Sequence, residues 1–202
     1  MSRYPGARFL ASAGSSASFG DDSGYEVAIA GRSNSGKSSA LNSIVRNRGL
    51  ARTSAMPGRT QAVNIFELEP GRRIVDLPGY GHARVPTAVQ EAWARLMDAY
   101  FAQRRSLSGL FIVVDARRGF GASDEAMLAY ALARGLPSHV LLSKADKLRR
   151  SEAAEALVVA RRALAGRAGV QTFSAESGEG VDAARGALEA MLSKHAKTPG
   201  DP

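Results

Sequence analysis

One segment near the N-terminus combines glycines, a lysine and serines in an order that suits phosphate binding. Residues 31–38 read G-x-x-x-x-G-K-S, after an apolar run at 27–30 and before a helical pattern at 39–45. Glycines let backbone N–H groups curl around a phosphate, the lysine bridges the β- and γ-phosphates of a nucleotide, and the serine hydroxyl binds Mg²⁺. The helix N-terminus adds a favourable dipole. A glycine-rich turn without a ligand is the alternative. We assign nucleotide binding to Gly31, Arg32, Ser33, Asn34, Ser35, Gly36, Lys37, Ser38 and Ser39.

A second candidate motif ends an apolar run farther along the chain. Asp76 closes the run that begins at Arg73, and the pattern D-x-P-G continues from it to Gly79. An aspartate at this place can hold Mg²⁺ through water, and the Gly79 N–H can meet a γ-phosphate. The same residues also make an ordinary turn after a strand, so the assignment depends on their position two strands after the phosphate-binding loop. The nucleotide-binding set therefore includes Asp76, Leu77, Pro78 and Gly79.

A threonine in a polar loop completes the predicted metal site. The loop lies between the helical pattern at 39–45 and the apolar run at 63–68. In nucleotide-dependent switches, a loop threonine of this kind binds Mg²⁺ while the γ-phosphate is present, and an ordinary loop threonine is the alternative. The loop adds Gly58, Arg59, Thr60, Gln61 and Ala62 to the nucleotide-binding set. The predicted metal ligands are Ser38, Thr60 and, through water, Asp76; the predicted catalytic residues are Lys37, Thr60 and Gly79.

Two later segments indicate which nucleotide base is bound. Asp146 follows the apolar run at 140–143, and the carboxyl edge of a parallel sheet is where a bound base would lie. Its carboxylate can accept hydrogen bonds from N1–H and the 2-amino group of guanine, a donor pair that adenine lacks. A surface lysine–aspartate pair is the alternative for this tetrapeptide alone. The predicted base-binding residues are Ser143, Lys144, Ala145 and Asp146, with backbone N–H groups from Phe173, Ser174 and Ala175 facing the guanine oxygen.

Apolar runs of strand length alternate with helical patterns, and these elements must position the motifs. Most runs are continuously apolar, as in strands that are covered on both faces. The alternation predicts an α/β fold with three layers, doubly wound around a mostly parallel six-stranded sheet. The close pair of runs around 69–72 predicts a hairpin with one antiparallel strand. The predicted strands are 27–30, 63–68, 73–76, 110–115, 140–143 and 171–173, and the predicted helices are 39–45, one behind an N-cap at Thr87, 124–133, 152–164 and 181–194.

The chain of 202 residues predicts one domain with extensions. Residues 1–24 are rich in Gly, Ser and Ala without a sustained period, which predicts a mostly irregular arm with room for a short strand around Arg8 to Ala11. We expect the domain at 25–195 and a flexible tail at 196–202. The chain has no cysteine, which excludes disulfides, Cys-ligated zinc, iron–sulfur clusters and a thiol nucleophile.

The residues of these motifs, in this order, resemble the EngB family, also called YihA or YsxC, of Ras-like P-loop GTPases. The resemblance runs from about residue 25 to 194 and is most specific in the hexapeptide from Asp76 to Gly81. His82 and Ala40 differ from the residues usual in the family at these positions, and neither difference removes a nucleotide contact. The resemblance implies a bacterial cytoplasmic GTPase that uses Mg²⁺, binds GTP and GDP, assists assembly of the large ribosomal subunit, and is linked to septation and cell division.

Catalysis is the step for which the sequence offers no obvious group. In Ras-like proteins a glutamine after D-x-x-G orients the attacking water, but Tyr80 stands there in this chain. We therefore expect slow intrinsic hydrolysis, helped by a partner, by an arginine in trans or by a monovalent cation, with Arg59 as a candidate in cis. Asn34 resembles the corresponding residue of potassium-activated GTPases, whose side chain shares K⁺ with the phosphates. Bracing of the loop backbone is the alternative role for Asn34.

The distribution of charge favours a polyanionic partner. The net charge is +8, and the stretch 27–66 holds six basic residues and no acidic one. Such a field suits nucleotide phosphates, an RNA backbone, or both. Together with what the resemblance implies, it leads us to expect the large ribosomal subunit or its rRNA as a partner. A dispersed basic surface without a partner is the alternative.

The longest run of aliphatic or aromatic residues is 110–114, far short of the roughly 18 that a membrane span requires. We therefore expect a soluble protein that does not bind membranes, which disfavours a membrane-associated or iron-transport GTPase. We also expect a monomer, and the family resemblance implies a cytoplasmic one. A P-loop ATPase or small-molecule kinase is a second alternative, against which Asp146 argues. A third is a GTP-gated RNA-binding module without a role at the ribosome.

Overall fold

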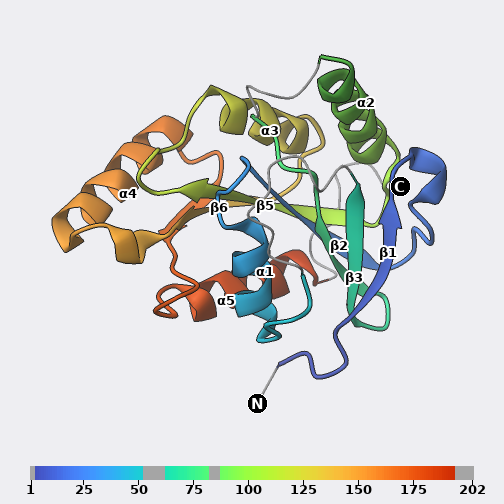
Figure 1. Cartoon of the computed structure of the whole chain (residues 1–202), viewed down its shortest axis with the longest axis horizontal. Helices are drawn as coiled ribbons and strands as arrows, with labels where there is room; N and C mark the ends of the chain where they lie inside the picture. Colours follow the sequence, from blue (N-terminus) through green and yellow to red (C-terminus); the bar gives the residue numbers. More distant parts are fainter. Residues whose placement is uncertain (1–2, 52–61, 82–86, 194–202) are drawn as a thin grey trace.

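A computed structural model describes residues 3–51, 62–81 and 87–193 of the chain. One sheet lies between two layers of helices (Figure 1). The strand order is β1-β3-β4-β2-β5-β6-β7, and only β3 runs against the other strands. The strands are β1 (Arg8–Ala13), β2 (Tyr25–Gly31), β3 (Val63–Glu69), β4 (Arg72–Asp76), β5 (Leu107–Asp115), β6 (Ser138–Ser143) and β7 (Gly169–Thr172).

The five α-helices of the described residues cover both faces of the sheet, as the continuous apolar runs predicted. Alternate residues of β2 point to opposite sides, so Val27 and Ile29 join one core cluster whereas Ala28 and Ala30 join the other. The first cluster is covered by α1 (Lys37–Val45) and α5 (Val181–Met191). The second is covered by α2 (Thr87–Gln103), α3 (Ala122–Ala133) and α4 (Arg150–Leu164). The three-layer α/β fold and the hairpin with one antiparallel strand are therefore confirmed.

The sheet has seven strands, so the predicted number of six was too low. The additional strand is β1, which pairs with β3 at the edge of the sheet and extends the short strand expected at Arg8 to Ala11. Only Ala13 of this strand is buried, while Phe9 and Leu10 are largely exposed. A strand that is paired on one side and open to water lacks the continuous apolar run that marks a buried strand.

Several predicted bounds differ from the structure by one to three residues, including the ends of the last strand and the last helix. The last strand ends at Thr172, one residue early, because Phe173 turns into the loop that faces β6, where its carbonyl accepts the Ala145 N–H. The last helix ends at Met191, and Leu192 follows as its C-cap. Within the described residues, none of the helices combines the length and apolar character that crossing a bilayer requires.

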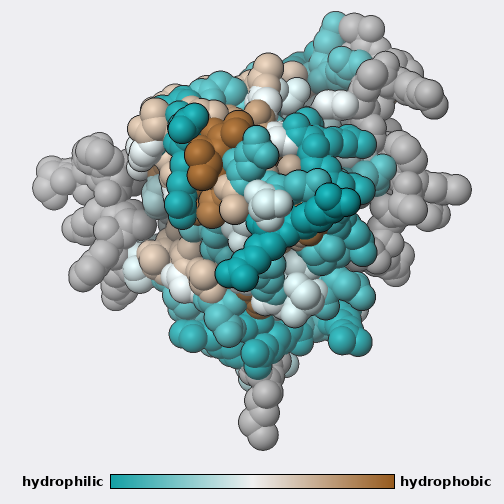
Figure 2. Space-filling view, turned by 90° about the vertical axis from the view of Figure 1, so that its left-hand side faces the viewer, coloured by the Kyte–Doolittle hydropathy of each residue, from teal (hydrophilic) through white to brown (hydrophobic). Residues whose placement is uncertain are grey.

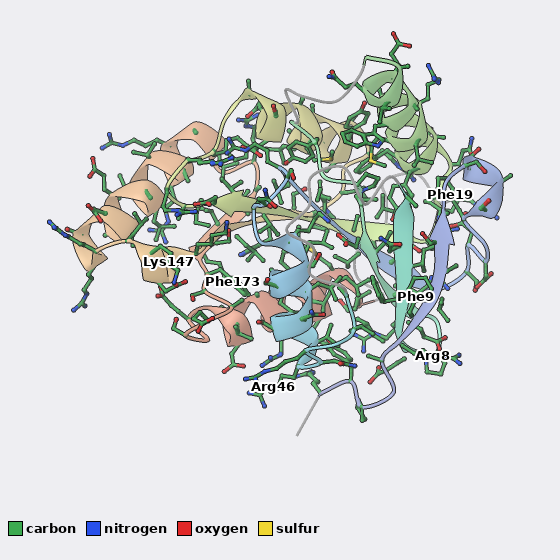
Figure 3. All side chains as sticks on the ribbon, in the orientation of Figure 1. Arg8, Phe9, Phe19, Arg46, Lys147 and Phe173 are labelled. Atoms are coloured by element: carbon green, nitrogen blue, oxygen red, sulfur yellow. The ribbon has the colours of Figure 1, made fainter. Side chains whose placement is uncertain are left out.

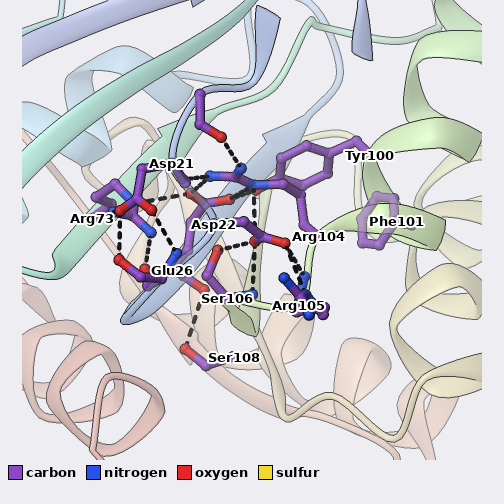
Figure 4. A network of polar contacts seen from close by, with 12 residues as sticks. Asp21, Asp22, Glu26, Arg73, Tyr100, Phe101, Arg104, Arg105, Ser106 and Ser108 are labelled. Atoms are coloured by element: carbon purple, nitrogen blue, oxygen red, sulfur yellow. Dashed lines mark hydrogen bonds and ion pairs between the residues drawn. The ribbon is translucent and has the colours of Figure 1, made fainter. Parts of the chain in front are cut away.

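A buried network of charges fastens the N-terminal arm to the start of the sheet (Figure 4). Its centre is Glu26, which is fully buried and accepts hydrogen bonds from the Tyr100 hydroxyl at 2.6 Å and from Arg104 at 2.7 Å. Arg73 contacts the same carboxylate at 3.3 Å. We call Glu26, Arg73, Tyr100 and Arg104, with Asp21 and Asp22 of the arm, the basal network.

Both a side chain and a backbone carbonyl of the arm form hydrogen bonds at this network. Asp22 accepts the Ser106 N–H at 2.9 Å, and the Asp21 carbonyl oxygen accepts Arg104 at 2.9 Å. Tyr4 and Phe19 of the arm are also buried. Residues 19–22 of the arm are therefore packed onto the domain at the edge where β2, β4 and β5 begin, opposite the edge that carries the sequence motifs, whereas β1 lies beside β3.

We expect Glu26→Gln to lower the free energy of unfolding by about 3 to 5 kcal/mol, because it leaves two buried guanidinium groups without their shared carboxylate. The midpoint and slope of urea unfolding measure this loss. Glu91→Gln is the matched control, since the ion pair of Glu91 with Arg95 at 3.8 Å is exposed, and the loss in this variant is expected to stay below about 0.5 kcal/mol. Equal losses in the two variants would show that the basal network does not stabilise the fold.

Candidate nucleotide-binding site

The predicted phosphate-binding loop joins the end of β2 to the start of α1, the strand–loop–helix arrangement that the motif requires. A Cβ at Gly31 would lie 2.6 Å from the Val113 carbonyl oxygen, so only glycine lets the loop leave β2 this close to β5. Gly36 precedes α1 with a φ of 91°, which favours glycine. The first turn of α1 carries no acidic residue. Its N–H groups and dipole therefore favour an anion at the loop.

Lys37 and Asp76 form an ion pair across this loop. Lys37 begins α1 and Asp76 ends β4, and their side chains are only 11% and 6% exposed. The two charges neutralise each other in a place that is nearly closed to water. A phosphate that took the Lys37 ammonium would leave Asp76 in need of another cation.

The residues here fit a magnesium ion that is shared with a nucleotide. Among the described residues, no group of three or more acidic or histidine side chains could hold a metal by themselves. The loop instead offers the Ser38 hydroxyl on α1 and the buried Asp76 carboxylate on β4. Mg²⁺ is commonly bound in this way, through one or two protein oxygens with phosphates and waters as the remaining ligands.

The segment after Asp76 lies along the phosphate-binding loop. Tyr80 forms a parallel bridge with Arg32: the Ser33 N–H donates to the Tyr80 carbonyl at 3.1 Å, and the Tyr80 N–H donates to the Gly31 carbonyl at 3.4 Å. A Cβ at Gly79 would lie 3.4 Å from the Ser33 Cα. Leu77, Pro78 and Gly79 are thus beside the loop, where a γ-phosphate of a bound nucleotide would be reached.

Two side chains at the end of β6 also brace the loop. The Ser143 hydroxyl donates to the Ser35 carbonyl at 2.5 Å, and the Lys144 ammonium donates to the Asn34 carbonyl at 2.5 Å. The Lys144 stem passes over Gly36, since a Cβ there would lie 3.6 Å from the lysine Cε. Phosphate and base elements therefore meet at the carboxyl edge of the sheet, as the topology of parallel strands requires.

Asp146 is held as an ionised acceptor by two neighbours. The Ser174 hydroxyl donates to one carboxylate oxygen at 2.6 Å, and the Lys147 ammonium lies 3.0 Å from the other. The hydrogen bond from Ser174, followed by that from Lys147, lowers the pKa of Asp146. Ser174 is itself fully buried and accepts the N–H groups of Glu176 and Ser177. The sequence predicted backbone contacts for Ser174 but missed that its side chain orients Asp146.

Asp115 is a further residue of this edge that the motifs did not include. It ends β5, is 3% exposed, and forms ion pairs with Lys144 at 3.1 Å and Arg117 at 2.6 Å. Burial alone would raise the pKa of Asp115, but hydrogen bonds from Arg117 and Lys144 outweigh burial and hold it well below its usual range. An aspartate that ends a continuous apolar run, as Asp76 does, was the signal that could have identified it.

The structure brings most of the predicted site residues together at one edge of the sheet. These are residues 31–39 and 76–79, which frame the phosphate-binding loop, and residues 143–146 and 173–175, which meet through the Ala145–Phe173 backbone bond. Ala62 lies just before β3. The predicted Gly58, Arg59, Thr60 and Gln61 lie outside the described residues, so the threonine ligand stays a prediction.

Comparisons with known proteins identify the family. Residues 26–144 match a family model described as 50S ribosome-binding GTPase. The "Probable GTP-binding protein EngB" of Xanthomonas campestris pv. campestris (strain 8004) is 47% identical over 199 residues, which cover 96% of each chain. This chain belongs to the EngB family of GTP-binding proteins. The EngB of Stenotrophomonas maltophilia (strain K279a) is 49% identical over 175 residues, 85% of this chain and 88% of the relative.

Solved structures show the same fold at low sequence identity. The crystal structure of a probable GTP-binding protein engB has a TM-score of 0.66 at 20% identity and covers 83% of this chain and 98% of that one. A variant of Aquifex aeolicus Era bound to GDP·AlF4⁻ has a TM-score of 0.62 at 17% identity, with 88% and 62% covered. The EngB chain therefore has the P-loop GTPase fold.

We expect Asp146→Asn to weaken GDP binding about 10- to 100-fold and to strengthen binding of xanthosine diphosphate, because the amide offers a donor where guanine needs an acceptor. Competition against a fluorescent guanine nucleotide measures both affinities. Asp182→Asn is the control, since Asp182 is 88% exposed and pairs with Arg185 on α5. If the wild type bound ADP as well as GDP, the assignment of Asp146 to the base would be wrong.

Proposed function

We propose that this EngB protein is a slow, Mg²⁺-dependent GTPase whose nucleotide state gates its binding to the large ribosomal subunit or its rRNA. The observation that carries the proposal is the convergence of three features at one sheet edge: the phosphate-binding loop, the Lys37–Asp76 pair, and an Asp146 carboxylate oriented by Ser174. The family description, 50S ribosome-binding GTPase, supports the ribosomal partner. The protein would act in the cytoplasm as a monomer during subunit assembly, and normal septation and cell division would depend on it.

The roles of the residues follow from their places around the loop. Lys37 would bind the β- and γ-phosphates, and the Gly79 N–H would donate to the γ-phosphate. Ser38 and Asp76, with Thr60 as the expected switch ligand, would hold Mg²⁺, which neutralises phosphate charge when it is bound. Asp146 would accept the guanine donors, and Lys144 would cover the base.

Slow hydrolysis is supported by the chemistry of Tyr80, which stands where Ras-like proteins have a catalytic glutamine. Its hydroxyl donates to the Asp124 carboxylate on α3 at 2.9 Å. Burial, followed by the charge of Asp124, raises the pKa of Tyr80 well above its ordinary value, which keeps the phenol protonated. A protonated phenol lacks the amide with which a glutamine orients an attacking water, so the missing catalytic help would come from elsewhere.

The basic stretch gives the proposed ribosomal contact a location. Arg46, which is labelled in Figure 3, and Arg48 are exposed just after α1, at the end of the helix away from the phosphate-binding loop. Nine residues of helix place this end about 13 Å from the loop. Arg46 and Arg48 can therefore meet an RNA backbone while a nucleotide is bound. Arg52, the next arginine of the basic stretch, lies outside the described residues.

The face that carries α4 offers a control with the same charge but a different surface. Arg150, Arg161 and Arg162 are exposed, and no ion pair with another described residue involves them. Figure 2 shows this face, where hydrophobic residues interrupt the hydrophilic surface; α4 exposes Val158 and Val159 there. A broken positive surface is a poor match for the continuous charge of an RNA backbone.

We expect the triple change of Arg46, Arg48 and Arg52 to Gln to weaken binding to isolated 50S subunits and to flatten its salt dependence. The slope of log affinity against log salt should fall by about 0.7 to 0.9 for each lost phosphate contact. Co-sedimentation in a GTP analogue and in GDP, over a range of salt, measures both. The triple change of Arg150, Arg161 and Arg162 to Gln should alter the slope less. Equal effects of the two triple variants would refute the assigned location, and binding that ignores the nucleotide would refute the gating.

We propose further that Asn34 binds K⁺ in the way suggested by its resemblance to potassium-activated GTPases. Asn34 is exposed with a φ of 60°, and its carbonyl accepts Lys144. Within the described residues its side-chain amide makes no hydrogen bond, so those residues lend no support to the alternative that it braces the loop. A cation beside the phosphates would stabilise the charge that builds up during transfer.

We expect GTP turnover to be faster in KCl than in NaCl at equal ionic strength and fixed Mg²⁺, and Asn34→Ala to abolish the difference. Turnover of both proteins in the two salts is the measurement. Asn47→Ala is the control, because Asn47 lies beyond the far end of α1. Turnover that ignores the cation, or full acceleration in Asn34→Ala, would leave the catalytic help to the ribosome or another partner.

A further inference from the structure

Asp124 is a fully buried carboxylate that belongs to none of the nucleotide-binding motifs. It lies in the first turn of α3. One of its oxygens accepts the Tyr80 hydroxyl at 2.9 Å. The other accepts the Gly121 N–H at 2.9 Å and lies 3.0 Å from an Arg32 guanidinium nitrogen. Both oxygens are thus used, and the bond to Gly121 fixes the carboxylate to the start of its own helix.

The two side chains that Asp124 binds come from the two segments that frame the γ-phosphate. Arg32 is the second residue of the phosphate-binding loop, and Tyr80 follows Gly79 directly. Arg32 also donates to the Gly119 carbonyl in the turn between β5 and α3. Because α3 is anchored in the core through Met127, Leu128 and Ala131, Asp124 cannot follow a movement of either segment.

The backbone bridge between Arg32 and Tyr80 closes a ring with these side-chain bonds. In this arrangement the Ser33 N–H is given to the Tyr80 carbonyl, and Gly79 is close enough that a Cβ would lie 3.4 Å from the Ser33 Cα. A γ-phosphate between the loop and the Gly79 N–H would need that space and would meet the Tyr80 carbonyl oxygen. The closed ring is therefore compatible with GDP, and GTP would have to open it.

We propose that Asp124 is a positioning residue of the GTPase site, which holds Tyr80 against the phosphate-binding loop and so favours GDP over GTP. The inference rests on the proposed function, because it presumes that the loop binds both nucleotides. Opening the ring for GTP breaks the Tyr80–Asp124 bond, while the Arg32–Asp124 pair keeps the buried charge neutralised. Asp124 thereby sets the cost of admitting the third phosphate without touching it.

Tyr80→Phe is the sharpest test, because it removes only the hydroxyl. The aromatic side chain at this position still lines the groove between α2 and α3 with Trp93 and Met97. We expect the ratio of GTP-analogue affinity to GDP affinity to rise about 10-fold, the low end of the range for a lost hydrogen bond to a charged group. Asp124→Asn should move the ratio in the same direction. The double variant should exceed neither single variant by much, since both break one bond. Binding of fluorescent GDP and of a fluorescent non-hydrolysable GTP analogue gives the ratio.

Tyr130→Phe is the matched control. Tyr130 lies on α3, as Asp124 does, and its hydroxyl donates to Asp98 of α2 at 2.6 Å. The change therefore removes another tyrosine–aspartate hydrogen bond, away from the phosphate-binding loop. Its affinity ratio should equal that of the wild type. Urea unfolding of each variant separates a change in the ratio from a general loss of stability.

The outcomes separate this inference from the function on which it rests. A ratio that rises in Tyr80→Phe but not in Tyr130→Phe supports the positioning role, even if Asp124→Asn does not fold. A wild type that binds both guanine nucleotides, with an unchanged or lower ratio in Tyr80→Phe, overturns the role of Asp124 and leaves the proposed function intact. A wild type that binds neither nucleotide overturns both.

Discussion

The ion pair between Lys37 and Asp76 constrains the chemistry of the whole carboxyl edge of the sheet, because both charges are almost removed from water. A buried charge that loses its partner costs several kcal/mol. Lys37 can therefore leave Asp76 only for another anion, and Asp76 can release Lys37 only if another cation replaces it. A phosphate together with a divalent cation meets both conditions at once, whereas a neutral ligand meets neither.

The same edge holds the loop in shape from three directions. Gly31 fits against β5, Tyr80 continues the β4 chain alongside the loop, and Ser143 with Lys144 braces it from β6. Few loop residues need to be ordered when a ligand arrives, which lowers the entropic cost of binding. The α/β topology makes this bracing available, because parallel strands bring their carboxyl ends to one place.

The sequence predicted those parts of the molecule that depend on neighbours in the chain. Apolar runs, most of them continuous, marked the strands from β2 to β7, and the loop at 31–38 was recognisable because glycine, lysine and serine have fixed roles around a phosphate. Strand β1 was only partly visible, since an edge strand with exposed Phe9 and Leu10 lacks the pattern of burial.

The pairing of side chains that are distant in the chain could not be predicted from the sequence. Ser174 reaches Asp146 across 28 positions, and Tyr80 reaches Asp124 across 44. Nothing in the local pattern around Asp124 distinguishes it from any acidic residue in the first turn of a helix, where the dipole already favours one. Its burial and its two partners exist only once α3 packs beside the loop.

The two ends of the sheet use buried charge in opposite ways. At the basal end, Glu26 has two arginines and a tyrosine as permanent partners, so every charge is satisfied within the fold. At the carboxyl end, Lys37 and Asp76 satisfy each other, and in the proposed function each exchanges its partner for a phosphate or a cation. Helix α2 connects the two ends of the sheet. Tyr100 near its C-terminus belongs to the basal network, and its N-terminus follows, along the chain, the segment that contains Gly79 and Tyr80.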